Sequence, residues 1–121
     1  MTDERPPVWV GHVVLQVTDL DRAHAFWTGI GMRAVEHGSN VAVLELRGGT
    51  HLVLVPSDEV APGEAPFDLM VDDLDATHAA YSAQGLAPSP IERGRIHDAF
   101  TLTDPDGYRV HVNSTHVVGP V

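Results

Sequence analysis

The sequence has no cysteine and no lysine among its 121 residues. The absence of cysteine excludes disulfide bonds, thiolate catalysis and cysteine-ligated zinc. The absence of lysine excludes Schiff-base chemistry and a P-loop lysine. No apolar run is long enough to span a bilayer, and Met1–Pro7 is charged and rich in proline, unlike a secretory signal. We therefore expect a soluble, cytoplasmic protein.

Positive charge is scarce as well. The 7 basic residues, all arginines, face 17 acidic ones, and 7 − 17 gives a net charge of −10. Such a surface repels phosphate backbones and anionic lipids, so we expect no nucleic-acid and no membrane partner. A hydrophobic content of 43% supplies enough apolar material for one core. The composition thus indicates a single acidic domain over residues 1–121.

The chain contains two copies of one pattern, offset by 54 residues. Val17–Met32 aligns with Val71–Leu86, and seven of the sixteen positions are identical. Such self-similarity indicates a duplicated structural unit. We therefore expect two modules, at about residues 8–55 and 66–113, joined by a proline-rich linker over residues 56–66.

Each module is expected to run strand, helix, strand, strand, strand. Asp19 and Asp73 are placed to cap the two helices, and Trp27 and Tyr81 fall at the spacing of core residues. Asp104–Gly107 has the composition of a tight turn. The expected strands cover residues 8–17, 33–36, 41–46, 50–55, 67–71, 86–92, 99–103 and 108–113. This order predicts an α+β fold.

Several short motifs in this order resemble the vicinal oxygen chelate superfamily, which includes glyoxalases, bleomycin-resistance proteins and extradiol dioxygenases. They are His12 with Val17–Asp21, Phe26–Trp27, Gly29–Met32, Val71–Asp75 and the hairpin Phe100–His111. The resemblance covers about residues 8–113. It implies two βαβββ modules that form an incomplete barrel, whose concave side holds a small ligand, often in a homodimer.

Side chains alternate between the two faces of a strand, so the sequence predicts which of them share the concave face. In this family a polar face of this kind is a site. His51 is interpreted instead as a surface residue at a strand end. The candidate ligand-binding residues are His12, Gln16, Val53, Asp68, Arg109, His111 and Asn113.

The resemblance also implies where a metal would be held, at His12, Val53, Pro66 and His111. Valine and proline offer no lone pair, and two imidazoles fall short of the three protein ligands of a catalytic site. Asp68 could complete a site of two histidines and one carboxylate with His12 and His111. We expect no cofactor, with a divalent metal at these three residues as the alternative.

Three functions are compatible with this pattern. The first is a small-molecule-binding protein that sequesters its ligand in the concave cup without a complete metal site. The second is a metal-dependent lyase, isomerase or dioxygenase with an irregular ligand set. The third is a metal-free acid–base enzyme that uses His12 or His111. Whether the protein is an enzyme stays open, no catalytic residue is assigned, and a homodimer is expected because half-barrels leave sheet edges uncovered.

Overall fold

A computed structural model describes residues 3–121. The first half of the chain forms one four-stranded sheet with the order β1-β4-β3-β2. Its strand β1 lies parallel to β4, and the other neighbours are antiparallel. Its elements are β1 (His12–Val17), α1 (Leu20–Gly29), β2 (Arg33–His37), β3 (Ala42–Glu45), the 3₁₀ turn η1 (Arg47–Gly49) and β4 (His51–Pro56).

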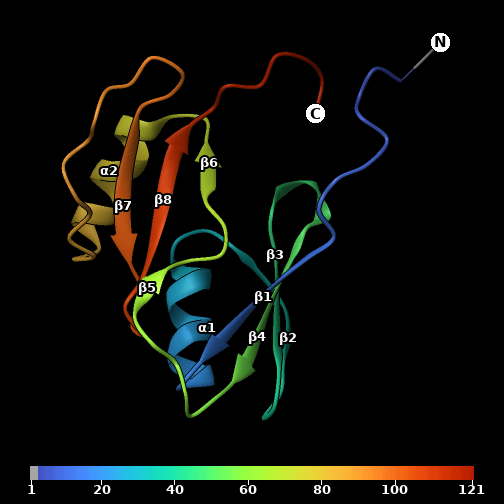
Figure 1. Cartoon of the computed structure of the whole chain (residues 1–121), viewed down its shortest axis with the longest axis vertical. Helices are drawn as coiled ribbons and strands as arrows, with labels where there is room; N and C mark the ends of the chain where they lie inside the picture. The colour runs from blue at the N-terminus through green and yellow to red at the C-terminus, as the bar shows by residue number, and fades with distance from the viewer. Residues whose placement is uncertain (1–2) are drawn as a thin grey trace.

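The second half forms a second sheet around its last strand. Two short strands pair with β8 in parallel, and β7 pairs with it antiparallel. The elements are β5 (Gly63–Glu64), β6 (Leu69–Val71), α2 (Leu74–Ala83), β7 (Ala99–Thr103) and β8 (Tyr108–Ser114). Figure 1 shows the first sheet on the right and the second at the upper left, with α2 beside β7 and β8.

Both helices begin as the sequence predicts. The Asp19 carboxylate accepts a hydrogen bond from the backbone N–H of Arg22, and the Asp73 carboxylate accepts one from that of Ala76. These bonds satisfy amide groups that lack a partner within the first helical turn. The two halves therefore start their helices with the same chemistry, which confirms the caps predicted from the repeat.

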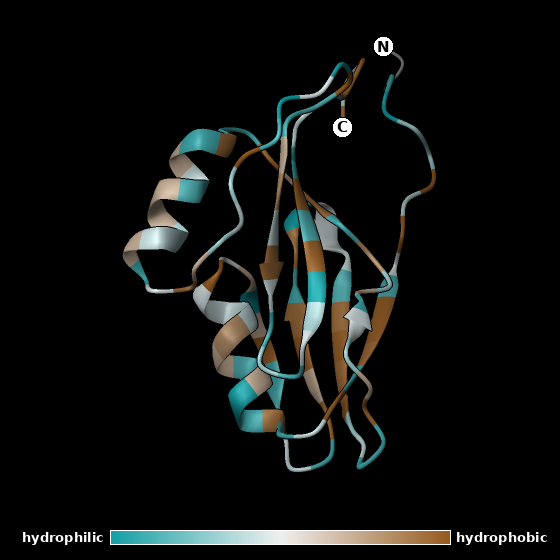
Figure 2. Ribbon diagram, turned by 60° about the vertical axis from the view of Figure 1, so that its left-hand side comes forward, coloured by the Kyte–Doolittle hydropathy of each residue, from teal (hydrophilic) through white to brown (hydrophobic). Residues whose placement is uncertain are grey.

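The core lies between the helices and the inner faces of the sheets. Figure 2 shows hydrophobic and hydrophilic residues alternating along the strands, as one covered face requires. Trp27 of α1 is fully buried, and its ring lies near those of Phe26 and Phe67. Tyr81 of α2 is 6% exposed and packs against Phe100. The prediction that Trp27 and Tyr81 are packing residues is confirmed.

The strand registers of the two halves correspond. Leu15 pairs with Leu54 between β1 and β4, and Leu69 pairs with Val112 between β6 and β8. The first members of these pairs are 54 residues apart, as in the sequence repeat, and the second members are 58 apart. The second half therefore has four more residues between β6 and β8 than the first half has between β1 and β4. These residues do not change the pairing of the strands themselves.

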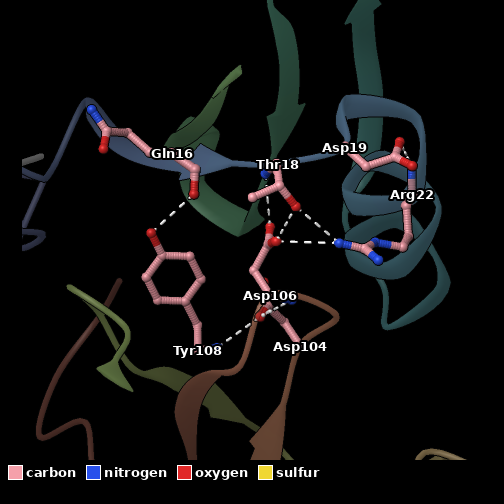
Figure 3. A network of polar contacts seen from close by, with 7 residues as sticks. All are labelled: Gln16, Thr18, Asp19, Arg22, Asp104, Asp106 and Tyr108. Atoms are coloured by element: carbon pink, nitrogen blue, oxygen red, sulfur yellow. Dashed lines mark hydrogen bonds and ion pairs between the residues drawn. The ribbon is translucent and has the colours of Figure 1, made fainter. Parts of the chain in front are cut away.

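Polar contacts join the halves at the β1–α1 junction (Figure 3). The Asp106 carboxylate, whose side chain is 5% exposed, accepts hydrogen bonds from the backbone N–H and hydroxyl of Thr18 and pairs with Arg22. The Tyr108 hydroxyl donates to the carbonyl of Gln16, at 2.9 Å. Asp104 stays within the turn, where it accepts from two backbone N–H groups, and burial raises its pKa.

Three sequence predictions need correction. Residues 86–92 do not form a strand, and only Glu92 bridges to Ala99. The expected linker contains β5, whose Gly63 and Glu64 pair with β8. The first strands are shorter than expected, because β1 begins at His12 and β6 at Leu69. The α+β class with open sheets is confirmed, and no helix in residues 3–121 has the length and apolar character needed to cross a membrane.

Candidate functional site

Each sheet has one face toward the core and one face away from it, its outer face. On the first sheet, the outer face carries every second side chain of β1 and β4. On β1, His12, Val14 and Gln16 are exposed, whereas Leu15 and Val17 are buried in the core. On β4, Val53 is half-buried beside Val14, its register partner. Both helices of residues 3–121 follow the strands at Leu20–Gly29 and Leu74–Ala83, and Val14 on this face is 56% exposed. The first sheet thus presents half-exposed valines next to polar groups.

A polar row crosses this face from one edge to the other. The backbone register aligns His12 with His51, His51 with Glu45, and Glu45 with Arg33. The two imidazole rings lie 5.8 Å apart, the His51 Nε2 is 3.0 Å from the Glu45 carboxylate, and Arg33 pairs with the same carboxylate. Hydrogen bonds from Arg33 and His51 lower the pKa of Glu45, so this carboxylate is ionised at neutral pH.

The outer face of the second sheet centres on Glu64 of β5. One of its carboxylate oxygens lies 2.8 Å from the His111 Nε2, and the other accepts from the Arg109 Nε at 3.1 Å. These two hydrogen bonds, the one to His111 first, lower the pKa of Glu64. The Thr101 hydroxyl is 3.4 Å from the His111 Nδ1. The His111 imidazole is therefore held between a carboxylate and a hydroxyl, and its side chain is 51% exposed.

The remaining two predicted residues form a separate pair. Asn113 of β8 is 6% exposed, and its side-chain amide donates to the Asp68 carboxylate at 3.2 Å. Asp68 precedes β6 and is itself exposed. Because the Asn113 side chain is buried, its amide holds the exposed Asp68 carboxylate in a fixed orientation.

The predicted site residues thus fall into three groups. His12, Gln16 and Val53 share the first sheet, Arg109 and His111 meet at Glu64, and Asp68 meets Asn113. Figure 1 places β1, which carries His12, and β8, which carries His111, in different sheets. Their membership of one common cup stays a prediction.

The donor set does not fit the family's metal site. Of the four implied positions, Val53 and Pro66 have no side-chain lone pair. Within residues 3–121, no three histidine, aspartate or glutamate side chains are grouped so that they could hold a metal ion. His111, one of the two donors left, already has Glu64 at its Nε2. No step through a metal follows from this arrangement.

Two carboxylates at the centre of these contacts, Glu45 and Glu64, were absent from the sequence prediction. Glu64 lies in a stretch interpreted as linker, and only its pairing with β8 brings it beside Arg109 and His111. Glu45 ends β3, where strand alternation places it on the same face as Val43 and opposite the buried Leu44. That alternation was a usable signal for Glu45. No local pattern signals Glu64.

Comparison with known proteins agrees with this architecture. The family model of the Glyoxalase/Bleomycin resistance protein/Dioxygenase superfamily matches residues 9–112. The comparison with curated proteins gave no match. Among solved structures, the chain is similar to lactoylglutathione lyase from Agrobacterium tumefaciens, with 21% identity and a TM-score of 0.78 over 96% of this chain and 100% of that one.

Two further solved structures are similar. TnmS3, an antibiotic-binding protein from Streptomyces sp. CB03234, is 24% identical with a TM-score of 0.76, over 92% of this chain and 98% of that one. A glyoxalase/bleomycin resistance protein/dioxygenase from Alicyclobacillus acidocaldarius is 24% identical with a TM-score of 0.73, over 93% and 96%. These likenesses show the fold, and the family model covers most of the sequence. The chain belongs to the glyoxalase/bleomycin resistance protein/dioxygenase superfamily.

Proposed function

We propose that the protein sequesters a small molecule in a concave cup, formed by the outer faces of its two sheets, without a complete metal site of the family type. The observation that carries this proposal is the make-up of the first sheet's outer face. Half-exposed Val14 and Val53 adjoin His12, and the next charged group, Glu45, is fixed by two partners. Exposed apolar side chains beside oriented polar groups are typical of a ligand site.

The family contains proteins of both kinds, because the similar structures include a lyase and an antibiotic-binding protein. The donor set favours binding, since Val53 and Pro66 replace two implied metal ligands. A second candidate is acid–base chemistry at His111. Its Nε2 faces Glu64 and its Nδ1 faces Thr101, an arrangement that orients an imidazole for proton transfer. The lyase, isomerase or dioxygenase alternative needs a metal held by other donors.

Metal analysis combined with ligand screening tests this proposal. The protein is purified without chelator, its metal content is measured, and a small-molecule library is screened by thermal shift. We expect hits whose affinity falls about tenfold in His12→Ala or His111→Ala, the cost of one lost polar contact. His116→Ala, in the exposed C-terminal segment, is the control. Stoichiometric metal that is lost in His12→Ala would contradict the proposal and favour the metal enzyme.

The proposal extends to assembly and location. We infer one domain of two modules, at about residues 8–55 and 66–113, that pairs into a homodimer. Exposed Val35 of the edge strand β2 supports association. We also propose a cytoplasmic location. Light scattering should give twice the 13.0 kDa chain mass. A single-chain mass at every concentration would contradict the dimer.

A further inference from the structure

A crevice of about 330 Å³ opens where the two halves meet. Val13 and Leu52 line it from the first sheet, and Phe67 lines it from the second half. Val13 and Leu52 follow His12 and His51 in their strands, so alternation points them to the opposite face of the sheet. The crevice therefore lies on the helix side of the first sheet, apart from the outer face that carries His12.

A groove of about 530 Å³ adjoins the crevice, since Arg47 and Thr50 line both. Its other walls come from the two ends of the chain. Trp9 of the N-terminal arm is 70% exposed and Val121 is 75% exposed, and both line the groove. Small-molecule sites commonly have volumes of about 300–1,000 Å³ and mostly apolar walls. Crevice and groove together meet both conditions.

The polar groups of the crevice differ in whether they have partners. The Arg47 guanidinium contacts both Asp72 carboxylate oxygens, at 3.2 and 2.6 Å. The Thr50 hydroxyl donates to the carbonyl of Val10 at 2.6 Å. Asp68 is different, because Asn113 donates to its Oδ2 and nothing within residues 3–121 donates to its Oδ1.

The charge of the crevice follows from these contacts. Asp72 neutralises Arg47, and Asn113 is an uncharged donor, so the charge of Asp68 is not compensated. A ligand would meet a negatively charged acceptor at one wall and apolar side chains at the others. Charge-assisted hydrogen bonds between an ammonium group and a carboxylate are stronger than neutral ones.

We propose that this crevice is a second small-molecule site, which binds a primary amine with an aromatic or aliphatic body. The ammonium group donates to the Asp68 Oδ1, and the apolar body lies against Val13, Leu52 and Phe67. The exposed Trp9 ring beside the groove offers a further surface for an apolar or cationic group. This site is independent of the outer-face site proposed above.

An NMR titration with a named probe tests the proposal. The ¹⁵N-labelled protein is titrated with 2-phenylethylamine and, separately, with 3-phenylpropionate, which has a similar body and the opposite charge. We expect saturable shifts of the backbone amides of Val13, Thr50, Phe67 and Asp68 with the amine. We expect 3-phenylpropionate to bind at least tenfold more weakly, because it meets Asp68 with like charge.

Two variants and one control locate the interaction. Asp68→Asn keeps the shape of the side chain and should weaken amine binding about tenfold. Asp58→Asn removes the same charge from an exposed site elsewhere and should have no effect. Val13→Phe fills the crevice and should abolish binding while Asp68 is intact. His111→Ala, which alters only the outer face, should leave amine binding unchanged.

Four results would overturn the proposal. The first is no saturable binding up to about 10 mM amine, and the second is equal affinity for the amine and the propionate. The third is an equal loss of affinity in Asp68→Asn and Asp58→Asn. The fourth is chemical-shift changes confined to the amides of His12, Val14 and His111. The last result would place the amine at the outer-face site, so it would refute the crevice and support the proposed function. Ligands that lose affinity in His111→Ala but keep it in Val13→Phe belong to the outer face.

Discussion

The two halves of the molecule follow the same order of elements and differ in how completely they form a sheet. In the first half, β1 pairs with β4 over six consecutive residues, and β2 adds a fourth strand. In the second half, the strand that corresponds to β1 is divided into β5 and β6. The counterpart of β2 is reduced to one bridge, between Glu92 and Ala99.

Proline accounts for both differences. Pro66 lies between β5 and β6, and Pro88 and Pro90 lie in the segment that corresponds to β2. Proline has no N–H to donate to a neighbouring strand, so it interrupts the hydrogen-bond ladder. Ala87, just before Pro88, has φ of +50°, which is incompatible with an extended strand. The second half keeps its inner strands and loses the regularity of its outer ones.

The outer faces diverge as well. The first sheet combines valines with the row from His12 to Arg33, whereas the second presents Arg109 and His111 around Glu64. The buried faces of both sheets stay apolar, because each must cover the core. The comparison teaches that the two halves share the core register and the helix caps, whereas their outer strands and outer faces differ.

The largest expected effect tests the two helices at equivalent positions. Trp27→Ala should lower the free energy of unfolding by about 4 kcal/mol, because it empties a fully buried site. Tyr81→Ala should cost about 3 kcal/mol, since that ring is smaller. Chemical denaturation monitored by circular dichroism gives both values. If Trp27→Ala does not fold, Trp27→Leu against Tyr81→Leu gives the same ranking. A greater loss at Tyr81 would show that the second half, despite its broken sheet, carries more of the stability.

Much of this architecture could be predicted from the sequence, because the repeat, the caps and the alternation are local patterns. Asp19, Asp73 and Trp27 act as their spacing indicates. The strand expected at residues 86–92 was wrong, although Pro88 and Pro90 were signals against it. The repeat predicts a strand here, but two prolines in this segment remove backbone N–H donors, and no strand forms.

The candidate site was less accessible to sequence analysis. Alternation predicted that His12, Gln16 and His111 share a concave face; all three are exposed on their strands, and the common cup stays a prediction. Glu64 could not be recognised, because its contacts depend on pairing with a strand more than forty residues away. His51 was interpreted as a surface residue, yet it is half-buried and bonded to Glu45. The crevice requires the two halves to be placed in space, which no local pattern does.

The contacts between the halves can be broken at Asp106. Asp106→Ala removes the acceptor for the backbone N–H and hydroxyl of Thr18 and the partner of Arg22. Because the Asp106 side chain is 5% exposed, we expect a loss of about 2 kcal/mol in the free energy of unfolding. Asp58→Ala, at an exposed aspartate, should change it by less than about 0.5 kcal/mol. Equal losses would mean that Asp106 does not join the halves.

Acid should weaken the first half through His24 of α1. Its ring stacks on that of His37 of β2, with centroids 3.9 Å apart, and the His37 Nε2 lies 2.7 Å from the Asp21 carboxylate. Burial first, and then the charge of His37, lower the pKa of His24, while Asp21 acts in the opposite direction. The unfolded chain therefore takes up a proton more readily than the folded one, so stability should fall as the pH drops through about 6.5.

Variants isolate this effect. Between about pH 7.5 and pH 5.5 the wild type should lose stability, and His24→Gln should lose less. His116→Gln, in the exposed C-terminal segment, should behave as the wild type. The pKa values of Glu45 and Glu64 lie below the usual 4.5, so these carboxylates stay charged throughout this window. An unchanged pH dependence in His24→Gln would assign the acid sensitivity to another group.

The smallest expected effect concerns the lost edge strand. The 54-residue offset matches Ala87 to Arg33, which begins β2 in extended conformation, whereas Ala87 is left-handed. Ala87→Gly should remove the steric contact between Cβ and the backbone, which stabilises the folded state by about 1 kcal/mol. Glycine also makes the unfolded chain more flexible, and this offsets part of the stabilisation. We expect a net stabilisation of about 0.5 kcal/mol by thermal unfolding. Ala80→Gly, on the exposed side of α2, should instead destabilise by about 1 kcal/mol. If both variants destabilise equally, Ala87 is not strained, and the prolines alone account for the missing strand.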